Sequence, residues 1–328
     1  MRHKFDKNIL ARSGPIVRRI TVPCALSSVR HHRHPTNMRR FTRQLALGQA
    51  LSAKIGLVDL RNSLSVDLRG KGLSASDVEA IAGELAENGA LDQLDVAQNG
   101  FGGDGAGAMA RVVRECPTLT SLCVDSNNLR AAAAELGEAV AAHPSLRFLG
   151  IAANVIGPTA TKSFASAVAS SPSLETLDFS ANAFGPIGGR ALAEALASSA
   201  RSSKLRRLDL TACGVGPTGA VALAEALGAH SLASIEMTTN FIGPDGLAAF
   251  AAMLRTNTTL EELSLSDNAI GELGNRDTGT CGSALAAALE ANSSLRVLDL
   301  TYNALSPAAM ELLRAASERR ATPLELRL

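Results

Sequence analysis

The sequence is poor in aromatic residues. They make up 3% of the 328 residues, with no tryptophan and a single tyrosine. A packed interior must therefore consist of Leu, Ile, Val and Ala, and a hydrophobic content of 46% is ample for one. No stretch approaches 18 consecutive apolar residues, so no transmembrane helix is expected. The start of the chain also lacks the uninterrupted apolar segment of a secretory signal.

Cysteines are few, odd in number and without C-x-x-C spacing, which argues against a disulfide framework or a zinc knuckle. Reduced thiols in an intracellular protein are the simpler interpretation. The two N-x-S/T sequences, at Asn257 and Asn292, are interpreted as turns that lead into strands rather than as glycosylation sites. The five cysteines are Cys24, Cys116, Cys123, Cys213 and Cys281.

Enzyme signatures are also missing. The chain has no P-loop, H-E-x-x-H, G-x-S-x-G or EF-hand spacing, so we predict no enzymatic activity and no cofactor. The glycines of residues 101–107 are interpreted as a turn and helix start rather than a phosphate loop. The run HHRH at residues 31–34 lacks further ligands nearby, and His143 and His230 are expected at helix ends. No metal site is predicted.

The net charge of +1 conceals a strong asymmetry. Residues 1–54 contain twelve Lys and Arg but one acid, a net charge of +11, whereas the remainder carries −10. Three interpretations of this basic head stay open: a transit peptide, a flexible tail before a capping helix, or a basic arm for acidic partners or nucleic acid. We divide residues 1–62 into a basic tail or targeting segment (1–37) and an N-terminal capping helix (38–62). The predicted location is cytoplasmic, or a mitochondrion or another organelle if a transit peptide is present.

Residues 63–328 repeat one pattern, L-x-x-L-x-L-x-x-N, followed by a turn and an alanine-rich amphipathic stretch. The steps between copies are 28, 28, 27, 28, 31, 27, 28 and 35 residues, and a period of this length is typical of a solenoid. We count about nine repeats and a partial tenth. The first copy begins at Ser63, and the clearer ones begin at Leu91, Leu119, Leu146, Leu174, Leu205, Leu232, Leu260 and Leu295.

Each copy predicts one strand, one turn and one helix. Apolar residues alternate through L-x-L, as in a strand, and the Asn stands where its amide can satisfy turn backbone. Pairs such as Gly185-Pro186 suit a turn followed by the first helical position. Parallel strands pack about 4.8 Å apart and helices about 8–10 Å apart, so the array is expected to curve.

Copies such as LETLDFSANAFGPIGGRALAEAL and LEELSLSDNAIG resemble the ribonuclease-inhibitor subtype of leucine-rich repeat proteins. The resemblance covers about four fifths of the chain. It implies an α/β horseshoe with parallel strands on the concave face and helices on the convex face, and a role as a protein-binding scaffold. Ran GTPase-activating proteins share the repeat type, which leaves such an activity as the alternative. Their long acidic tail has no counterpart here, where the chain ends in PLELRL.

The concave face is the predicted binding site for a protein partner. Six of the nine central strand positions are acidic, which suggests a partner with a basic surface, although Asp between these leucines is also frequent whatever such repeats bind. We expect the C-terminal group Asp267, Arg296, Asp299 and Tyr302 to contribute most. No small-molecule substrate is expected. The full predicted set is Asp178, Asp209, Glu236, Asp267, Arg296, Asp299, Tyr302, Arg147, Phe148 and Arg207.

Two further departures from the repeat lie near the C-terminus. Residues 271–282 hold about seven extra residues, interpreted as a tolerated surface insertion or as a recognition loop. Leu326 and Leu328 fit the start of a tenth strand with no helix after it. An uncapped strand edge favours pairing, so we predict some self-association.

Overall fold

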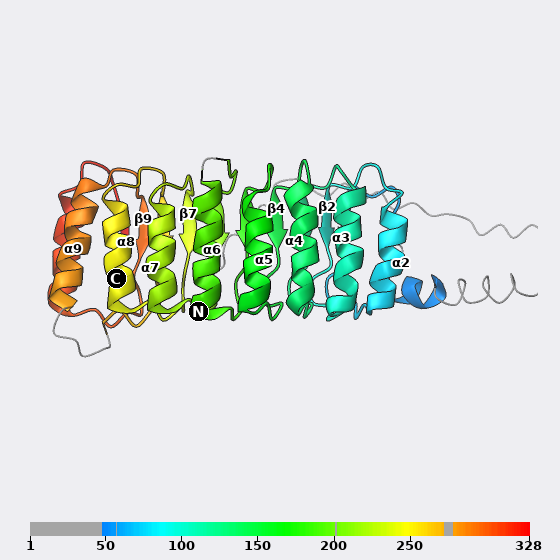
Figure 1. Cartoon of the computed structure of the whole chain (residues 1–328), viewed down its shortest axis with the longest axis horizontal. Coiled ribbons are helices and arrows are strands. Elements are labelled where there is room, and N and C mark those ends of the chain that lie inside the picture. The colour runs from blue at the N-terminus through cyan, green and yellow to red at the C-terminus, as the bar shows by residue number, and fades with distance from the viewer. Residues whose placement is uncertain (1–47, 57, 201, 272–277) are drawn as a thin grey trace, which may run out of the picture. The chain divides into compact units, whose positions relative to one another are not determined.

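The fold is an α/β solenoid. A computed structural model describes residues 48–56, 58–200, 202–271 and 278–328, and residues 49–328 form one compact unit. Ten strands of this part make one parallel sheet in which every strand pairs with its neighbours in sequence. The helices lie in a row over one face of the sheet (Figure 1), which leaves the other face, here called the open face, uncovered. This arrangement confirms the predicted strand–turn–helix repeat.

Every strand is three residues long, and the helices of the repeats span ten to fifteen residues. Two short 3-10 helices, Gly103–Gly105 and Arg130–Ala132, precede α3 and α4. The strands are β1 Ser65–Asp67, β2 Gln93–Asp95, β3 Ser121–Cys123, β4 Phe148–Gly150, β5 Thr176–Asp178, β6 Arg207–Asp209, β7 Ser234–Glu236, β8 Glu262–Ser264, β9 Val297–Asp299 and β10 Glu325–Arg327. The helices are α2 Ala75–Leu85, α3 Ala106–Glu115, α4 Ala133–Ala142, α5 Pro158–Ala169, α6 Gly185–Ser199, α7 Gly216–Leu227, α8 Gly243–Leu254, α9 Thr278–Ala291 and α10 Pro307–Glu318.

The core lies between the sheet and the helices. The middle residue of each strand from β1 to β9, such as Leu94 or Leu122, is buried against the helices, while its two neighbours face the open side. In the middle of the array the Phe179 ring stacks between Phe164 (5.0 Å) and Phe184 (5.3 Å). The rest of the described core is mainly aliphatic, with Phe101 and Phe250 as further buried rings.

A ladder of asparagines ties the repeats together at the ends of the strands. The Asn127 Nδ2 donates to the carbonyl oxygens of Val96 (3.0 Å) and Val124 (2.9 Å). Its Oδ1 accepts from the backbone N–H groups of Asn99 (3.0 Å) and Gly100 (2.9 Å). Each amide therefore satisfies backbone of two repeats, as predicted. The other members are Asn99, Asn154, Asn182, Asn240, Asn268 and Asn303.

Two positions depart from the asparagine ladder. Cys213 fills one slot completely buried, with Sγ 3.4 Å from the Phe179 carbonyl oxygen. A thiol is a weaker donor than an amide, so this step of the ladder has fewer strong hydrogen bonds. Lys71 takes the slot in the first copy and is exposed, in line with the looser packing expected there.

The asparagine turns have a backbone conformation that the sequence does not predict. The residue before the Asn has a positive φ in every repeat from Gln98 (61°) to Tyr302 (59°). The residue after it is often also left-handed, including the β-branched Val155 (58°) and the aromatic Phe241 (56°). Such residues disfavour this region, so the asparagine hydrogen bonds must hold them there.

A second set of polar side chains stabilises the opposite edge, where helices lead into strands. The Asn257 Oδ1 accepts from Leu260 N (2.8 Å), and Asn292 does the same for Leu295 N (2.8 Å). Both asparagines are 5% exposed, so the N-x-S/T sequences serve as buried turn connectors, in keeping with their interpretation as turns. His143 takes the equivalent role, since its Nδ1 accepts from Leu146 N at 2.9 Å.

The described residues before the first repeat pack onto it. Residues 48–55 are helical, and Ile55 is buried in the core. The Lys54 ammonium forms an ion pair with Asp77 at 2.5 Å and a hydrogen bond with the Gly72 carbonyl oxygen at 3.0 Å. Residues 1–47, with the basic tail and the start of the predicted capping helix, lie outside the described residues. No helix in the described part of the chain is long and apolar enough to cross a membrane.

Candidate functional site

The strand register gathers the predicted central positions into one row on the open face. Asp178 pairs with Asp209, and Asp209 pairs with Glu236, so three carboxylates stand on three adjacent strands. This register is the one expected from the repeat. The whole row runs Asp67, Asp95, Cys123, Gly150, Asp178, Asp209, Glu236, Ser264, Asp299 and Arg327.

The acids of the row also cap turns, a role that the sequence reasoning missed. Asp178 Oδ1 accepts from Ser180 N (3.1 Å) and Ser180 Oγ (2.6 Å). Asp209 accepts in the same way from Thr211 N (2.8 Å). Glu236 with Thr238 and Asp299 with Thr301 repeat the arrangement. The signal in the sequence is an acid followed two positions later by Ser or Thr.

The row is neutralised near its ends and left charged in the middle. Arg69 forms an ion pair with Asp95 at 2.8 Å, and Arg327 approaches Asp299 at 3.5 Å. Asp178, Asp209 and Glu236, here called the central acidic cluster, form no ion pair among the described residues. Parallel strands are about 4.8 Å apart, so these carboxylates repel one another with little screening by salt.

Asp209 at the centre of the cluster is 7% exposed. Burial raises the pKa of its carboxyl to about 7, the neighbouring charges of Asp178 and Glu236 add to that rise, and the hydrogen bonds from Thr211 oppose it. The Asp209 carboxyl is therefore about half protonated at pH 7. A cation placed over it would favour full ionisation.

The predicted arginines lie beside the row. Arg147 and Arg296 each precede a strand and pair loosely with a glutamate of a neighbouring repeat, Glu175 (3.4 Å) and Glu261 (3.4 Å). Arg207, on β6, is exposed and has no ion pair within the described ranges. Such surface pairs contribute little to stability, so these guanidinium groups are available to a partner.

Phe148 supplies the one aromatic ring on the strands of the open face in the described residues. It is half-buried on β4, two positions before Gly150. A Cβ on Gly150 would lie 3.4 Å from this ring and 2.9 Å from Asp125 Oδ1, so the missing side chain makes room for both. Phe148 thus forms the border of the central acidic cluster on the N-terminal side.

The predicted C-terminal group is spread across the width of the array. Arg296 precedes β9, Asp299 ends it, and Tyr302 follows in the turn, 76% exposed. Asp267 lies in the turn of the previous repeat and accepts a hydrogen bond from Thr239 Oγ1 at 2.9 Å. Asp267 and Tyr302 therefore share the strand-to-helix edge, while Arg296 lies at the opposite edge.

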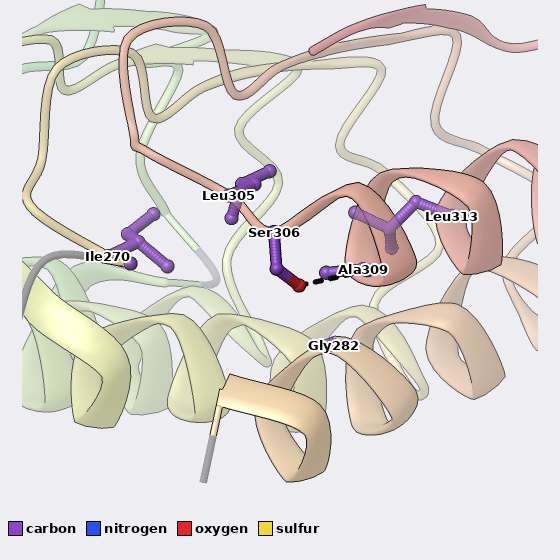
Figure 2. A pocket seen from close by; sticks show the side chains of 7 residues that line it. Ile270, Gly282, Leu305, Ser306, Ala309 and Leu313 are labelled. Atoms are coloured by element: carbon purple, nitrogen blue, oxygen red, sulfur yellow. Dashed lines mark hydrogen bonds between the residues drawn. The ribbon is translucent and has the colours of Figure 1, made fainter. Parts of the chain in front are cut away.

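Two hollows lie near the C-terminal end of the array. Figure 2 shows one of about 10 Å³ between the last two repeats, with Ile270, Leu305 and Leu313 around it. Small-molecule sites are usually about 300–1,000 Å³. An open hollow of about 400 Å³ next to Arg296 and Glu325 lies on the surface. No group of three His, Cys, Asp or Glu residues in the described ranges is arranged to hold a metal ion.

Gly271, which lines the same hollow, allows two turns to pack closely. A Cβ there would overlap the Ala304 carbonyl oxygen. We expect Gly271→Ala to lower the free energy of unfolding by about 1–3 kcal/mol, because backbone must move. Chemical denaturation followed by circular dichroism measures this, with Gly157→Ala, where a Cβ meets open space, as the control. Equal stability of the two variants would contradict the packing argument. Half of the insertion at residues 271–282, residues 272–277, lies outside the described residues.

The comparisons with known proteins agree with this architecture. A family model described as Leucine Rich repeat matches residues 170–193, 201–224, 256–274 and 291–313. No curated protein is similar enough to count as a match. The leucine-rich repeat-containing protein LegL7 from Legionella pneumophila is similar in structure at a TM-score of 0.50 and 18% identity, over 83% of this chain and 85% of that one. The match supports the fold alone.

Two weaker structural matches cover less of the chain. The tropomodulin C-terminal domain of Caenorhabditis elegans matches at a TM-score of 0.37 and 20% identity, over 45% of this chain and 84% of that one. Actin-binding site 2 of leiomodin-1 matches at a TM-score of 0.34 and 20% identity, over 40% of this chain and 70% of that one.

Proposed function

We propose that this leucine-rich repeat solenoid is a non-enzymatic scaffold that binds a protein partner with a basic surface on its open face. The observation that carries the proposal is the central acidic cluster of Asp178, Asp209 and Glu236, which has no ion pair among the described residues. One of the two hollows described above is too small for a ligand and the other is open to the surface, which favours a protein over a small molecule. Leucine-rich repeat proteins generally bind other proteins.

The fold itself does not require these charges. Cys123, Gly150 and Ser264 occupy the same row position in other repeats, so a neutral residue is compatible with the strand. A neutral Asn could also accept the hydrogen bond that caps each turn. Three adjacent carboxylates that repel one another are therefore better explained by attraction of a cationic partner. The electric field of such a cluster also guides a cationic partner toward it during association.

We also infer that the repeats are of the ribonuclease-inhibitor subtype. Support comes from the full α-helix in each described repeat, between ten residues in α3 and fifteen in α6. Buried free thiols at Cys116, Cys123 and Cys213 support a reducing location.

The first test is neutralisation of the cluster. The variant Asp178→Asn/Asp209→Asn/Glu236→Gln should bind an arginine–serine repeat peptide at least tenfold more weakly than the unmodified chain, because three carboxylates are lost. Fluorescence anisotropy at low salt measures the dissociation constants, and a tenfold change corresponds to about 1.4 kcal/mol. Added salt should weaken binding to the unmodified chain.

The matched control removes the same charge from the helical side. Glu138, Glu194 and Glu225 are exposed on α4, α6 and α7, so Glu138→Gln/Glu194→Gln/Glu225→Gln alters net charge but not the open face. This control should bind the peptide within twofold of the unmodified chain. An equal loss in both triple variants would show that only net charge matters, and the proposal would then fail. Acceleration of GTP hydrolysis on a partner would contradict the non-enzymatic assignment.

A second prediction concerns the C-terminal group. We expect Arg296→Ala/Tyr302→Ala to weaken binding of the physiological partner by about 2 kcal/mol or more, because Arg and Tyr are frequent energetic anchors at interfaces. Tyr302 is largely exposed and Arg296 is only loosely paired, so stability should change little. Once a partner is identified, isothermal titration calorimetry gives the affinity. Unchanged affinity would exclude this group from the site.

A further inference from the structure

An apolar edge lies beside the central acidic cluster. At the strand-to-helix turns of four consecutive repeats, Val155, Ile187 and Phe241 are 61%, 65% and 66% exposed. These large side chains are exposed to water, whereas most large apolar residues of the described repeats are buried. Exposed apolar residues that gather together mark an interaction surface. The apolar edge consists of Val155, Ala183, Pro186, Ile187, Pro217 and Phe241.

The turns of the apolar edge pack against one another. A Cβ on Gly216 would lie 3.0 Å from Pro186 Cγ, and one on Gly243 would lie 3.7 Å from Pro217 Cγ. Successive prolines therefore adjoin the glycines of the next repeat and make the edge continuous. Glycine at these positions keeps the turns close together. The surface is one strip rather than scattered residues.

The strip also carries no charge. The four stretches that form it, residues 152–161, 180–189, 211–224 and 238–244, contain no Asp, Glu, Lys, Arg or His. Exposed charged residues follow these stretches within the helices, at Lys162 in α5, Arg190 in α6 and Asp245 in α8. The apolar turns are thus bordered by charge on their helical side.

The apolar edge shares the three repeats of the central acidic cluster and begins one repeat earlier, at Val155 after β4. Asp178 ends β5, and Ala183 and Pro186 follow it in the turn and at the start of α6. The sequence Asp209 to Pro217 repeats this order in the next copy. Phe241 follows Glu236 by five residues, so their Cα atoms are at most about 18 Å apart.

We propose that these two neighbouring surfaces form one docking site for an amphipathic helix of a partner protein, with Lys or Arg along one stripe and apolar side chains along the next. The proposal rests on the function proposed above and adds the shape of the partner. An α-helix is about 10–12 Å wide, so one helix lying along the array between the two rows can contact both with its long side chains. Its basic stripe faces Asp178, Asp209 and Glu236, and its apolar stripe covers Val155, Ile187 and Phe241.

Charge complementarity selects this occupant over a second copy of the chain. Two copies joined through the same surface about a two-fold axis would bring their acidic clusters toward each other. Like charges placed together across an interface cost several kcal/mol. A basic partner instead neutralises the cluster, while its apolar stripe removes three large side chains from water.

The experiment compares two synthetic peptides of about 18 residues, both made of Lys and Leu in equal numbers. One has helical spacing that separates the two kinds of residue onto adjacent stripes, and the other is a scrambled order with the same charge. The full chain should bind the patterned peptide at least tenfold more tightly by fluorescence anisotropy. The edge variant Val155→Asn/Ile187→Gln/Phe241→Asn should lose that advantage. Asn tolerates the positive φ of Val155 and Phe241, so folding is preserved.

Controls separate this inference from the proposed function. Leu64→Ser removes a side chain that is 63% exposed near β1 and should leave both peptides unaffected. Neutralising Asp178, Asp209 and Glu236 should weaken both peptides. If the edge variant binds the patterned peptide as tightly as the unmodified chain, the docking site is wrong while the proposed function stands. If neutralisation changes neither peptide, the proposed function fails with it. A mass that falls toward the monomer only in the edge variant would assign the strip to self-association and overturn the proposal.

Discussion

Replacing Asn182 by Ala is expected to lower the free energy of unfolding by about 3–5 kcal/mol. Its Nδ2 donates to the carbonyl oxygens of Ile151 (2.9 Å) and Phe179 (3.0 Å). Its Oδ1 accepts from the N–H groups of Asn154 (2.9 Å) and Ile156 (3.1 Å). The substitution leaves four backbone groups without these partners in a buried turn, each costing about 1–3 kcal/mol before water partly replaces the amide. Urea denaturation followed by circular dichroism measures the loss.

An exposed asparagine provides the control for this prediction. Asn62 donates to Asp59 at 3.0 Å on the surface and holds no buried backbone group in place. Asn62→Ala should therefore change the free energy of unfolding by less than about 1 kcal/mol. Similar losses in both variants would mean that the ladder contributes no more than an ordinary surface turn.

The leucine period was sufficient to predict the strands and their register. Because the repeat fixes which residue of each copy occupies a given position, Asp178, Asp209 and Glu236 were expected in one row, and the strand pairing confirms it. The asparagine ladder followed from the same logic, since a buried turn needs a donor and an acceptor at a fixed place. Local periodicity thus determines the fold of the described repeats.

What the sequence could not show depends on contacts between repeats. The positive φ of Val155 and Phe241 contradicts their intrinsic preferences and is imposed by neighbouring asparagines. The pairing of Arg147 with Glu175 requires two repeats to stand side by side, and the burial of Asp209 depends on its neighbours on both strands. The D-x-S/T pattern is present in the sequence, but the hydrogen bonds were needed to show that its acid caps a turn.

Replacing Asp209 by Asn is expected to stabilise the protein above neutral pH. The pKa of the carboxyl is raised from 3.8 to about 7 in the folded chain, mainly by burial. The folded state therefore holds a proton between these values that the unfolded state releases, so stability is fully present below pH 3.8 and is lost as pH rises through 7. The lost stability is on the order of 4 kcal/mol. Asn stays neutral and should recover most of it at pH 8, with little change near pH 4.

Comparing the unmodified chain with Asp209→Asn at each pH separates the effect of the Asp209 carboxyl on stability from that of the histidines. Burial lowers the pKa of His143 and of His230, so both reduce stability as pH falls below 6.5, but they do so equally in the two proteins. Chemical denaturation from pH 4 to 8 should therefore give a difference curve that rises through the titration of Asp209 alone. A flat curve would show that the carboxyl is already compensated. A rising curve would mean that the chain retains a charge at a cost to its own stability, where Asn would serve the turn equally well.

A basic partner that removes this cost on binding should bind more tightly as pH rises through 7, and Asp209→Asn should abolish that dependence.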